Sequence, residues 1–177
     1  SLIARYCAFV RHPIKLGKEV LNETKPLWTK SPANLNDDDY RKFFRKLFPT
    51  SPEPLFWVHL NVDYPFNLRG VLYFPKFSHQ FEATEGQVKL YCNQVFVADN
   101  CKELIPEYLT VLKGIIDIPD LPLNVSRSYL QNEPQIKKIS EHITKKIADK
   151  FIGMSKTEPE KFIEFWKDIH PFVKYCM

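Results

Sequence analysis

Arg127, in the stretch LPLNVSRSYLQ (121–131), is the residue with the strongest potential for chemistry. A guanidinium is planar, permanently charged and fork-shaped, so it can stabilise the charge that develops on a transferring phosphoryl group. The stretch is typical of the start of a helix, where Gln131 would share the helical face of Arg127. The alternative is an arginine that binds a carboxylate or a helix end, and composition alone favours this structural role.

The sequence contains no phosphate-binding loop. Such a loop needs clustered glycines so that backbone amides can wrap the phosphate, and neither GxGxxG nor GxxxxGK[ST] occurs in the chain. GxSxG and HExxH are absent as well, and no Ser-His-Asp triad is indicated. An arginine on this chain could therefore act only on a nucleotide that another domain holds.

Other polar residues are better explained by structure than by catalysis. His59 lies in an apolar strand pattern and His142 in a helical one, where a hydrogen-bonded structural histidine is the commoner case. The acidic run 37–39 could imitate a cation site, but after Asn36 it predicts the start of a helix. Zinc-ligand or compact disulfide spacing is absent from the cysteines, which are expected to be reduced and buried: Cys7, Cys92, Cys101 and Cys176.

Composition predicts one globular, soluble unit. The 177 residues are 44% hydrophobic, which is enough for one sizeable core. The net charge of +4 is spread along the chain, so it argues weakly for a nucleic-acid or membrane partner, and no RNA-binding motif or basic stripe is present. No apolar run is long enough to span a membrane and no secretion signal is seen, so we expect a cytoplasmic protein. The missing initial methionine and the apolar helical ending indicate a piece of a longer protein.

Hydrophobic spacing predicts a mixture of helices and strands. Helices are expected at 2–10, 36–48, 101–117, 135–154 and 157–175, the last with a kink or break at Pro171. Strands are expected at 55–63, 68–75 and within 88–99, with a short one possible at 124–126. Strands grouped in the middle with helices on both sides predict layered α/β packing.

Five stretches, in colinear order, resemble the middle domain of the heat shock protein 90 chaperone family, particularly its bacterial form HtpG. They are KPLWTKSPANLNDDDYRKFF (25–44), LFWVHLNVDYPFNLRGVLYFPK (55–76), KLYCNQVFVADNCKELIPEYL (89–109), LKGIIDIPDLPLNVSRSYLQ (112–131) and KKISEHITKKIADKF (137–151). The resemblance implies a layered α/β/α sandwich, similar to domain 2 of ribosomal protein S5, over 1–155. It also implies that a helical connector begins over 156–177.

The resemblance implies, further, that the parent protein is a dimeric, ATP-driven chaperone of the cytoplasm. Its N-terminal domain would bind ATP and Mg²⁺ and its C-terminal domain would dimerise, and both lie outside this chain. Client proteins are then the expected partners. The chain by itself is expected to bind no cofactor and to hydrolyse no ATP.

The roles of individual residues follow only from this resemblance. Arg127 matches the family's catalytic arginine, which contacts the γ-phosphate when the dimer closes, and Asn124 and Gln131 match polar residues of the same catalytic loop. Phe96 matches an apolar residue that supports that loop, and Trp28 matches a tryptophan implicated in client contact.

Two departures from the family pattern bear on these roles. Many relatives have arginines where this chain has Asn93 and Gln94, so a positive charge in the interdomain contact is lost. The loop 76–86 lacks the amphipathic basic pattern of eukaryotic relatives, and its Phe77 and Phe81 could either contact clients or pack locally. The alternative function is a client or cochaperone docking module in which Arg127 is purely structural.

Overall fold

The structure, a computed structural model, describes residues 2–76, 87–99, 104–106, 109–121 and 133–175. Its helices are α1 (Leu2–Tyr6), α2 (Asp37–Leu47), α3 (Glu133–Thr157) and α4 (Pro159–Tyr175), with short 3-10 turns η1 (Leu27–Thr29) and η2 (Pro32–Asn34). Its strands are β1 (Lys15–Leu16), β2 (Glu19–Val20), β3 (Pro54–Val62), β4 (Leu68–Pro75), β5 (Gln87–Cys92), β6 (Val95–Asp99) and β7 (Lys113–Asp117). The protein is thus a mixed α/β structure.

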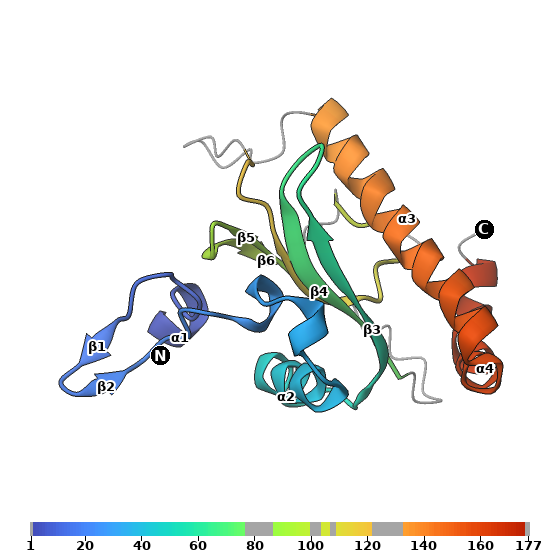
Figure 1. Ribbon diagram of the computed structural model, residues 1–177, viewed down its shortest axis with the longest axis horizontal. Coiled ribbons are helices and arrows are strands. Elements are labelled where there is room, and N and C mark those ends of the chain that lie inside the picture. The colour runs from blue at the N-terminus through green and yellow to red at the C-terminus, as the bar shows by residue number, and fades with distance from the viewer. Residues whose placement is uncertain (1, 77–86, 100–103, 107–108, 122–132, 176–177) are drawn as a thin grey trace.

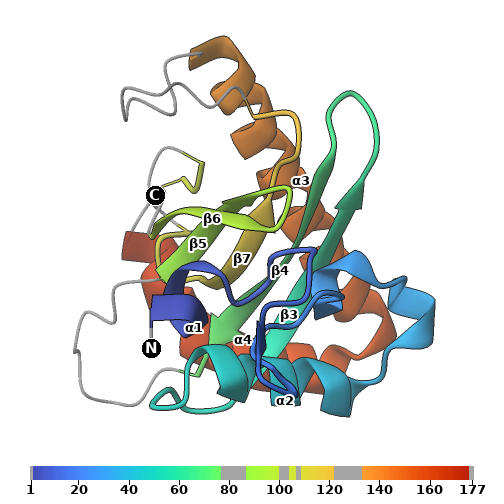
Figure 2. The same cartoon turned by 90° about the vertical axis from the view of Figure 1, so that its left-hand side faces the viewer.

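Five of the strands form one mixed sheet in the order β3-β4-β7-β5-β6. Neighbouring strands are antiparallel except for β5 and β7, which run parallel. Figure 2 looks onto the sheet with α3 and α4 behind it and α1 and α2 in front. In Figure 1 the small β1–β2 hairpin projects away from the sheet beside α1.

The helix predicted over 101–117 is wrong at its end, because 113–117 forms the central strand β7. All five residues of β7 are buried, and a short run that is apolar on both faces has no period that separates a strand from a buried helix. Position 114 of this strand requires a glycine for a steric reason. It has φ +153°, and a Cβ there would lie 2.1 Å from the carbonyl oxygen of Val71 on β4.

Helices α3 and α4 cover one face of the sheet. In the helix predicted over 135–154, the apolar spacing places five residues on one face: Ile136, Ile139, Ile143, Ile147 and Phe151. The four isoleucines are buried and Phe151 is partly buried against the same cluster, so this face is confirmed. They pack against inward residues of β3 and β4 such as Leu60 and Leu72, which are fully buried. No helix in the described ranges is long and apolar enough to cross a membrane.

The last predicted helix is confirmed, but a break at Pro171 is wrong, because α4 runs as one helix from Pro159 to Tyr175. A proline lacks the N–H that would bond the carbonyl four residues earlier, which here belongs to Lys167. The Nδ1 atom of His170 lies 3.0 Å from that oxygen and, when protonated, supplies a replacement donor.

The other face of the sheet carries an aromatic cluster beneath α2 and η1. Its members include Phe9, Trp28, Phe43, Phe44 and Tyr91, all buried.

The helix start predicted at Asn36 is confirmed. The Oδ1 atom of Asn36 accepts from the Asp39 N–H at 3.0 Å, and Asp39 Oδ2 accepts from the Asn36 N–H at 3.0 Å. The three aspartates therefore begin α2.

Candidate functional site

The three residues predicted to act in catalysis, Asn124, Arg127 and Gln131, lie outside the described residues. The structure does describe the chain on either side of them. Residues 118–121 follow β7, and α3 begins at Glu133. The geometry of the candidate site is therefore the set of contacts that hold the chain as it enters 122–132.

The chain that leaves β7 is bonded to β5 and to the turn after it. The main-chain N–H of Ile118 donates to the Tyr91 carbonyl at 3.0 Å. The carbonyl of Pro119 accepts from Asn93 Nδ2 at 3.1 Å and from Cys92 Sγ at 3.6 Å. Burial raises the pKa of the Cys92 thiol, so this cysteine is a neutral donor rather than a reactive thiolate.

The same segment is held from its other side by the turn between β3 and β4. Asn67 donates to Asp120 Oδ2 twice, from its main-chain N–H at 3.2 Å and from Nδ2 at 2.7 Å. One residue later, the Leu121 N–H donates to the Ile118 carbonyl at 3.2 Å, and the Leu121 side chain is buried. Two turns thus fix the chain up to the last described residue before 122–132.

Asp117, the last residue of β7, is a buried carboxylate with a solvent exposure of 4%. Its Oδ2 accepts from Trp28 Nε1 at 3.1 Å and from the Gln94 N–H at 3.0 Å. Burial raises the pKa of Asp117, and the bonds from Trp28 and from the turn, with the charge of Arg11, partly oppose that rise. Its Oδ1 atom has no partner among the described residues.

Asn93 and Gln94 form the turn between β5 and β6, with φ of 52° and 66°. Two-residue hairpin turns of this kind favour asparagine, which tolerates the left-handed conformation. The Arg11 guanidinium donates to Asn93 Oδ1 at 2.9 Å. The turn has no cation of its own, as the sequence indicates, but Arg11 places a guanidinium against it.

Trp28, predicted to contact clients, is 1% exposed. Its ring packs edge-to-face on Phe9 with centroids 4.7 Å apart, and its indole nitrogen is bonded to Asp117. In this structure Trp28 is therefore part of the core and joins η1 to β7. Contact with a client through Trp28 would need the side chain to leave this packing, and that role stays a prediction.

Phe96, predicted to support the catalytic loop, lies half-buried on the edge strand β6. Its ring packs edge-to-face against Tyr91, with centroids 5.6 Å apart. Because the Tyr91 carbonyl holds Ile118, this packing connects Phe96 to the segment after β7. Its role in loop support stays a prediction, and Phe77 and Phe81 lie outside the described residues.

The two histidines occupy positions that suit structural roles. His59 Nδ1 lies 2.9 Å from the Tyr40 hydroxyl, and burial lowers the pKa of His59. His142 packs edge-to-face on Phe66, and burial together with two neighbouring lysines lowers the pKa of His142. No group of three or more His, Cys, Asp or Glu side chains that could hold a metal occurs within the described residues.

Sequence reasoning missed the residues that anchor the segment, namely Asn67, Asp117 and Asp120. One pattern could have indicated Asp117, since a carboxylate inside the apolar run GIIDI requires buried partners. The Asn-Gln pair between two strand patterns could likewise have indicated a left-handed turn at Asn93. No local pattern indicates the pairing of Asn67 with Asp120.

Comparisons with known proteins place the chain in a family. The family model described as "Hsp90 protein" matches residues 12–177. The chain is 47% identical to chaperone protein HtpG of Bacteroides thetaiotaomicron over 192 aligned positions, which cover all of this chain and 28% of the relative. It is also 48% identical to HtpG of Porphyromonas gingivalis, with the same coverage, and 34% identical to HtpG of Fusobacterium nucleatum. The chain therefore belongs to the Hsp90 family of chaperones, and it spans less than a third of these relatives.

Proposed function

We propose that this chain is the middle-domain segment of an ATP-dependent molecular chaperone. In this proposal residues 1–155 form the large α/β/α unit, similar to domain 2 of ribosomal protein S5, and 156–177 begin a helical connector. The parent protein is a cytoplasmic homodimer that binds client proteins. The observation that carries the proposal is the similarity of the whole chain to HtpG chaperones at nearly half of its positions.

Arg127 has the central role in the proposed mechanism. The chain lacks the glycine loops that cradle phosphates, so ATP and Mg²⁺ would be held by a separate N-terminal domain. When the domains close, the guanidinium of Arg127 would donate to the terminal phosphate and stabilise the charge that spreads over its oxygens. Asn124 and Gln131 would orient the same loop.

The anchored segment before 122–132 supports this role. A side chain that must contact a phosphate in another domain is placed more accurately when the chain before it is held, because misplacement by about 1 Å can cost a large factor in rate. The carbonyl of Pro119 and the carboxylate of Asp120 are each held by a turn of the sheet. Closure of the domains, rather than phosphoryl transfer, would then limit the rate of hydrolysis.

Steady-state ATP hydrolysis by the full-length protein tests the proposal. Arg127→Ala should lower kcat by at least about tenfold while nucleotide affinity is preserved, because the arginine acts on the transition state. Arg127→Lys should restore little, since an ammonium lacks the planar fork. Arg45→Ala is the matched control. This exposed arginine pairs with Glu53 on the surface and should leave kcat unchanged.

A near-wild-type kcat in Arg127→Ala would contradict the catalytic role. The chain would then be assigned to the alternative function, a docking module for clients or cochaperones with Arg127 in a structural ion pair. Thermal unfolding of the same variant separates the two. The docking function, with Arg127 in a structural ion pair, predicts a lower Tm for Arg127→Ala, whereas the catalytic function predicts a Tm near that of wild type.

A further inference from the structure

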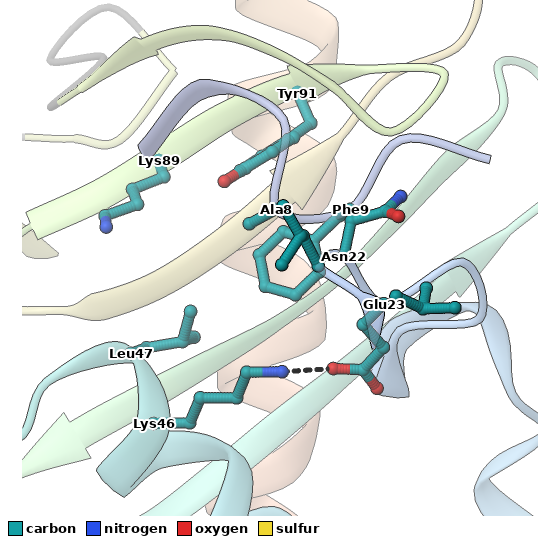
Figure 3. Close-up of a pocket in the computed structure, with 10 residues that line it drawn as sticks. Ala8, Phe9, Asn22, Glu23, Lys46, Leu47, Lys89 and Tyr91 are labelled. Atoms are coloured by element: carbon teal, nitrogen blue, oxygen red, sulfur yellow. Dashed lines mark hydrogen bonds and ion pairs between the residues drawn. The ribbon is translucent and has the colours of Figure 1, made fainter. Parts of the chain in front are cut away.

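A hollow lies on the aromatic face of the sheet, between the N-terminal segment, the end of α2 and β5 (Figure 3). Its volume is about 710 Å³, which is within the usual range of small-molecule sites. None of the residues predicted for catalysis, loop support or client contact lines it. The chemistry of its walls decides what it could bind.

The floor of the hollow is apolar. Phe9 is 2% exposed and packs edge-to-face on Tyr91, with centroids 5.7 Å apart. Ala8 and Leu47, both half-buried, line the hollow as well, and so does Val20, which is exposed. Such a floor can bury a phenyl or branched aliphatic group.

Two polar side chains enter the hollow from β5. Lys89 and Tyr91 are two positions apart on the strand and so project from the same face of the sheet. Figure 3 shows both side chains reaching from β5 in one direction. The Tyr91 side chain is almost completely buried, yet none of the hydrogen bonds within the described residues uses its hydroxyl. Burial, with the charges of Asp99 and Asp117, raises the pKa of Tyr91, so the hydroxyl remains a donor at neutral pH.

Lys46 and Glu23 on the opposite wall neutralise each other. Their Nζ and Oε2 atoms are 2.6 Å apart, drawn as a dashed line in Figure 3. The Lys46 ammonium also lies 5.6 Å from the centroid of the Phe9 ring. The pair therefore adds no net charge to the hollow.

Lys89, in contrast, belongs to none of the ion pairs within the described part of the chain. Its Nζ lies 5.8 Å from the centroid of the Phe48 ring, and the buried ammonium of Lys113 lies 5.8 Å from the same centroid. Asp99 stands opposite Lys89 in the β5–β6 register but is exposed. Lys89 therefore presents an ammonium at the hollow that a bound anion could contact.

We propose that this hollow binds a small organic anion, a carboxylate carried on an apolar body. The carboxylate would accept hydrogen bonds from the Lys89 ammonium and the Tyr91 hydroxyl, and the apolar body would lie on Phe9 between Ala8 and Leu47. A carboxylate can accept from both groups and carries a charge opposite to that of Lys89, whereas a neutral amide offers the ammonium only an uncharged and weaker acceptor. This site goes beyond the proposed function and does not depend on it.

A titration followed by amide chemical shifts tests the proposal on the 177-residue chain. The probes are 3-phenylpropionate and its uncharged amide, 3-phenylpropionamide. The acid should cause saturable shifts centred on Phe9, Leu47, Lys89 and Tyr91, and the amide should bind at least about tenfold more weakly, because hydrogen bonds to a charged group are the stronger ones.

Variants then assign the two donors. Lys89→Gln should weaken binding of the acid by about tenfold or more, and Tyr91→Phe by about fivefold. Lys42→Gln is the control, since this lysine lies exposed on α2 and does not line the hollow. Thermal unfolding of each variant separates a loss of binding from a loss of fold.

Three results would overturn the proposal. Equal binding of the acid and the amide would show that the site does not recognise a carboxylate. If no saturable shifts appear at about 10 mM probe, a concentration at which a ligand of this size should bind, the hollow is not a binding site for such ligands. Binding only of a peptide that ends in a carboxylate beside an aromatic residue would assign the hollow to a protein partner instead of a small molecule.

Discussion

The two faces of the sheet are built from different chemistry. The face under α3 and α4 is filled with aliphatic and phenyl groups, such as Leu60, Leu72 and Ile139. The face under α2 and η1 mixes aromatic rings with buried polar groups, including the carboxylate of Asp117 and the hydroxyl of Tyr73, which donates to the Tyr40 carbonyl at 3.0 Å. Both faces reach the segment before 122–132, since Asp117 on the second face precedes it and its buried side chains, Ile118 and Leu121, belong to the first.

The two faces are therefore expected to contribute differently to stability and to geometry. An aliphatic face stabilises the fold without regard to direction or pH, because burial of apolar area is non-directional. A polar face costs free energy wherever a group is left unpaired, but it fixes one geometry where the groups are matched. We expect substitutions of apolar residues on the first face to change stability alone, and substitutions of the polar groups on the second face to change both stability and its pH dependence.

The largest effect is expected on the aliphatic face. Ile139→Ala removes a fully buried side chain from α3 and should lower the free energy of unfolding by about 2–5 kcal/mol. Ile152→Ala, on an exposed part of the same helix, should change it by less than about 0.5 kcal/mol. Urea denaturation of the chain measures both. If the two variants lose equal stability, α3 does not pack on the sheet as described.

A smaller loss is expected on the polar face. Trp28→Phe keeps an aromatic ring but removes the donor to Asp117, and should cost about 1–3 kcal/mol. The control is Trp166→Phe, because Trp166 is 40% exposed on α4 and should change stability little. Similar urea midpoints for the two variants would mean that the Trp28–Asp117 bond contributes nothing.

Much of the fold could be predicted from local patterns, and the errors arise where distant parts of the chain decide the structure. The cap at Asn36 and the buried stripe of α3 depend on residues within a few positions, so their patterns sufficed. Strand β7 was missed because its neighbours are β4 and β5, and nothing within 113–117 itself reveals them. A short apolar run acquires its structure from the strands beside it.

The residues of the candidate site also separate into those that local sequence could predict and those that it could not. Arg127 could be named from the sequence because its neighbours in the chain carry the family pattern. The groups that hold the preceding segment could not. Trp28 and Asp117 are 89 residues apart, and Asn67 and Asp120 are 53 apart, so each pair meets only in the folded chain.

The subtlest difference between the two faces is expected in their response to pH. Asp117 has a folded-state pKa raised above its ordinary value of 3.8, mainly because it is buried. Between that value and the raised pKa the folded chain binds more protons than the unfolded chain, so the contribution of Asp117 to stability falls as pH rises. Asp117→Asn cannot ionise and should lack this dependence.

The measurement is the difference in Tm between wild type and Asp117→Asn from pH 3.5 to pH 7, since other carboxylates cancel in the difference. Wild type should lose stability relative to the variant as pH rises from about 3.8, and the difference should level off once the buried carboxyl is ionised. Ile139→Ala should differ from wild type by the same amount at every pH, because no titrating group is changed. A difference for Asp117→Asn that is equally flat would show that the polar face holds this carboxylate at no cost, and the contrast between the two faces would then rest on geometry alone.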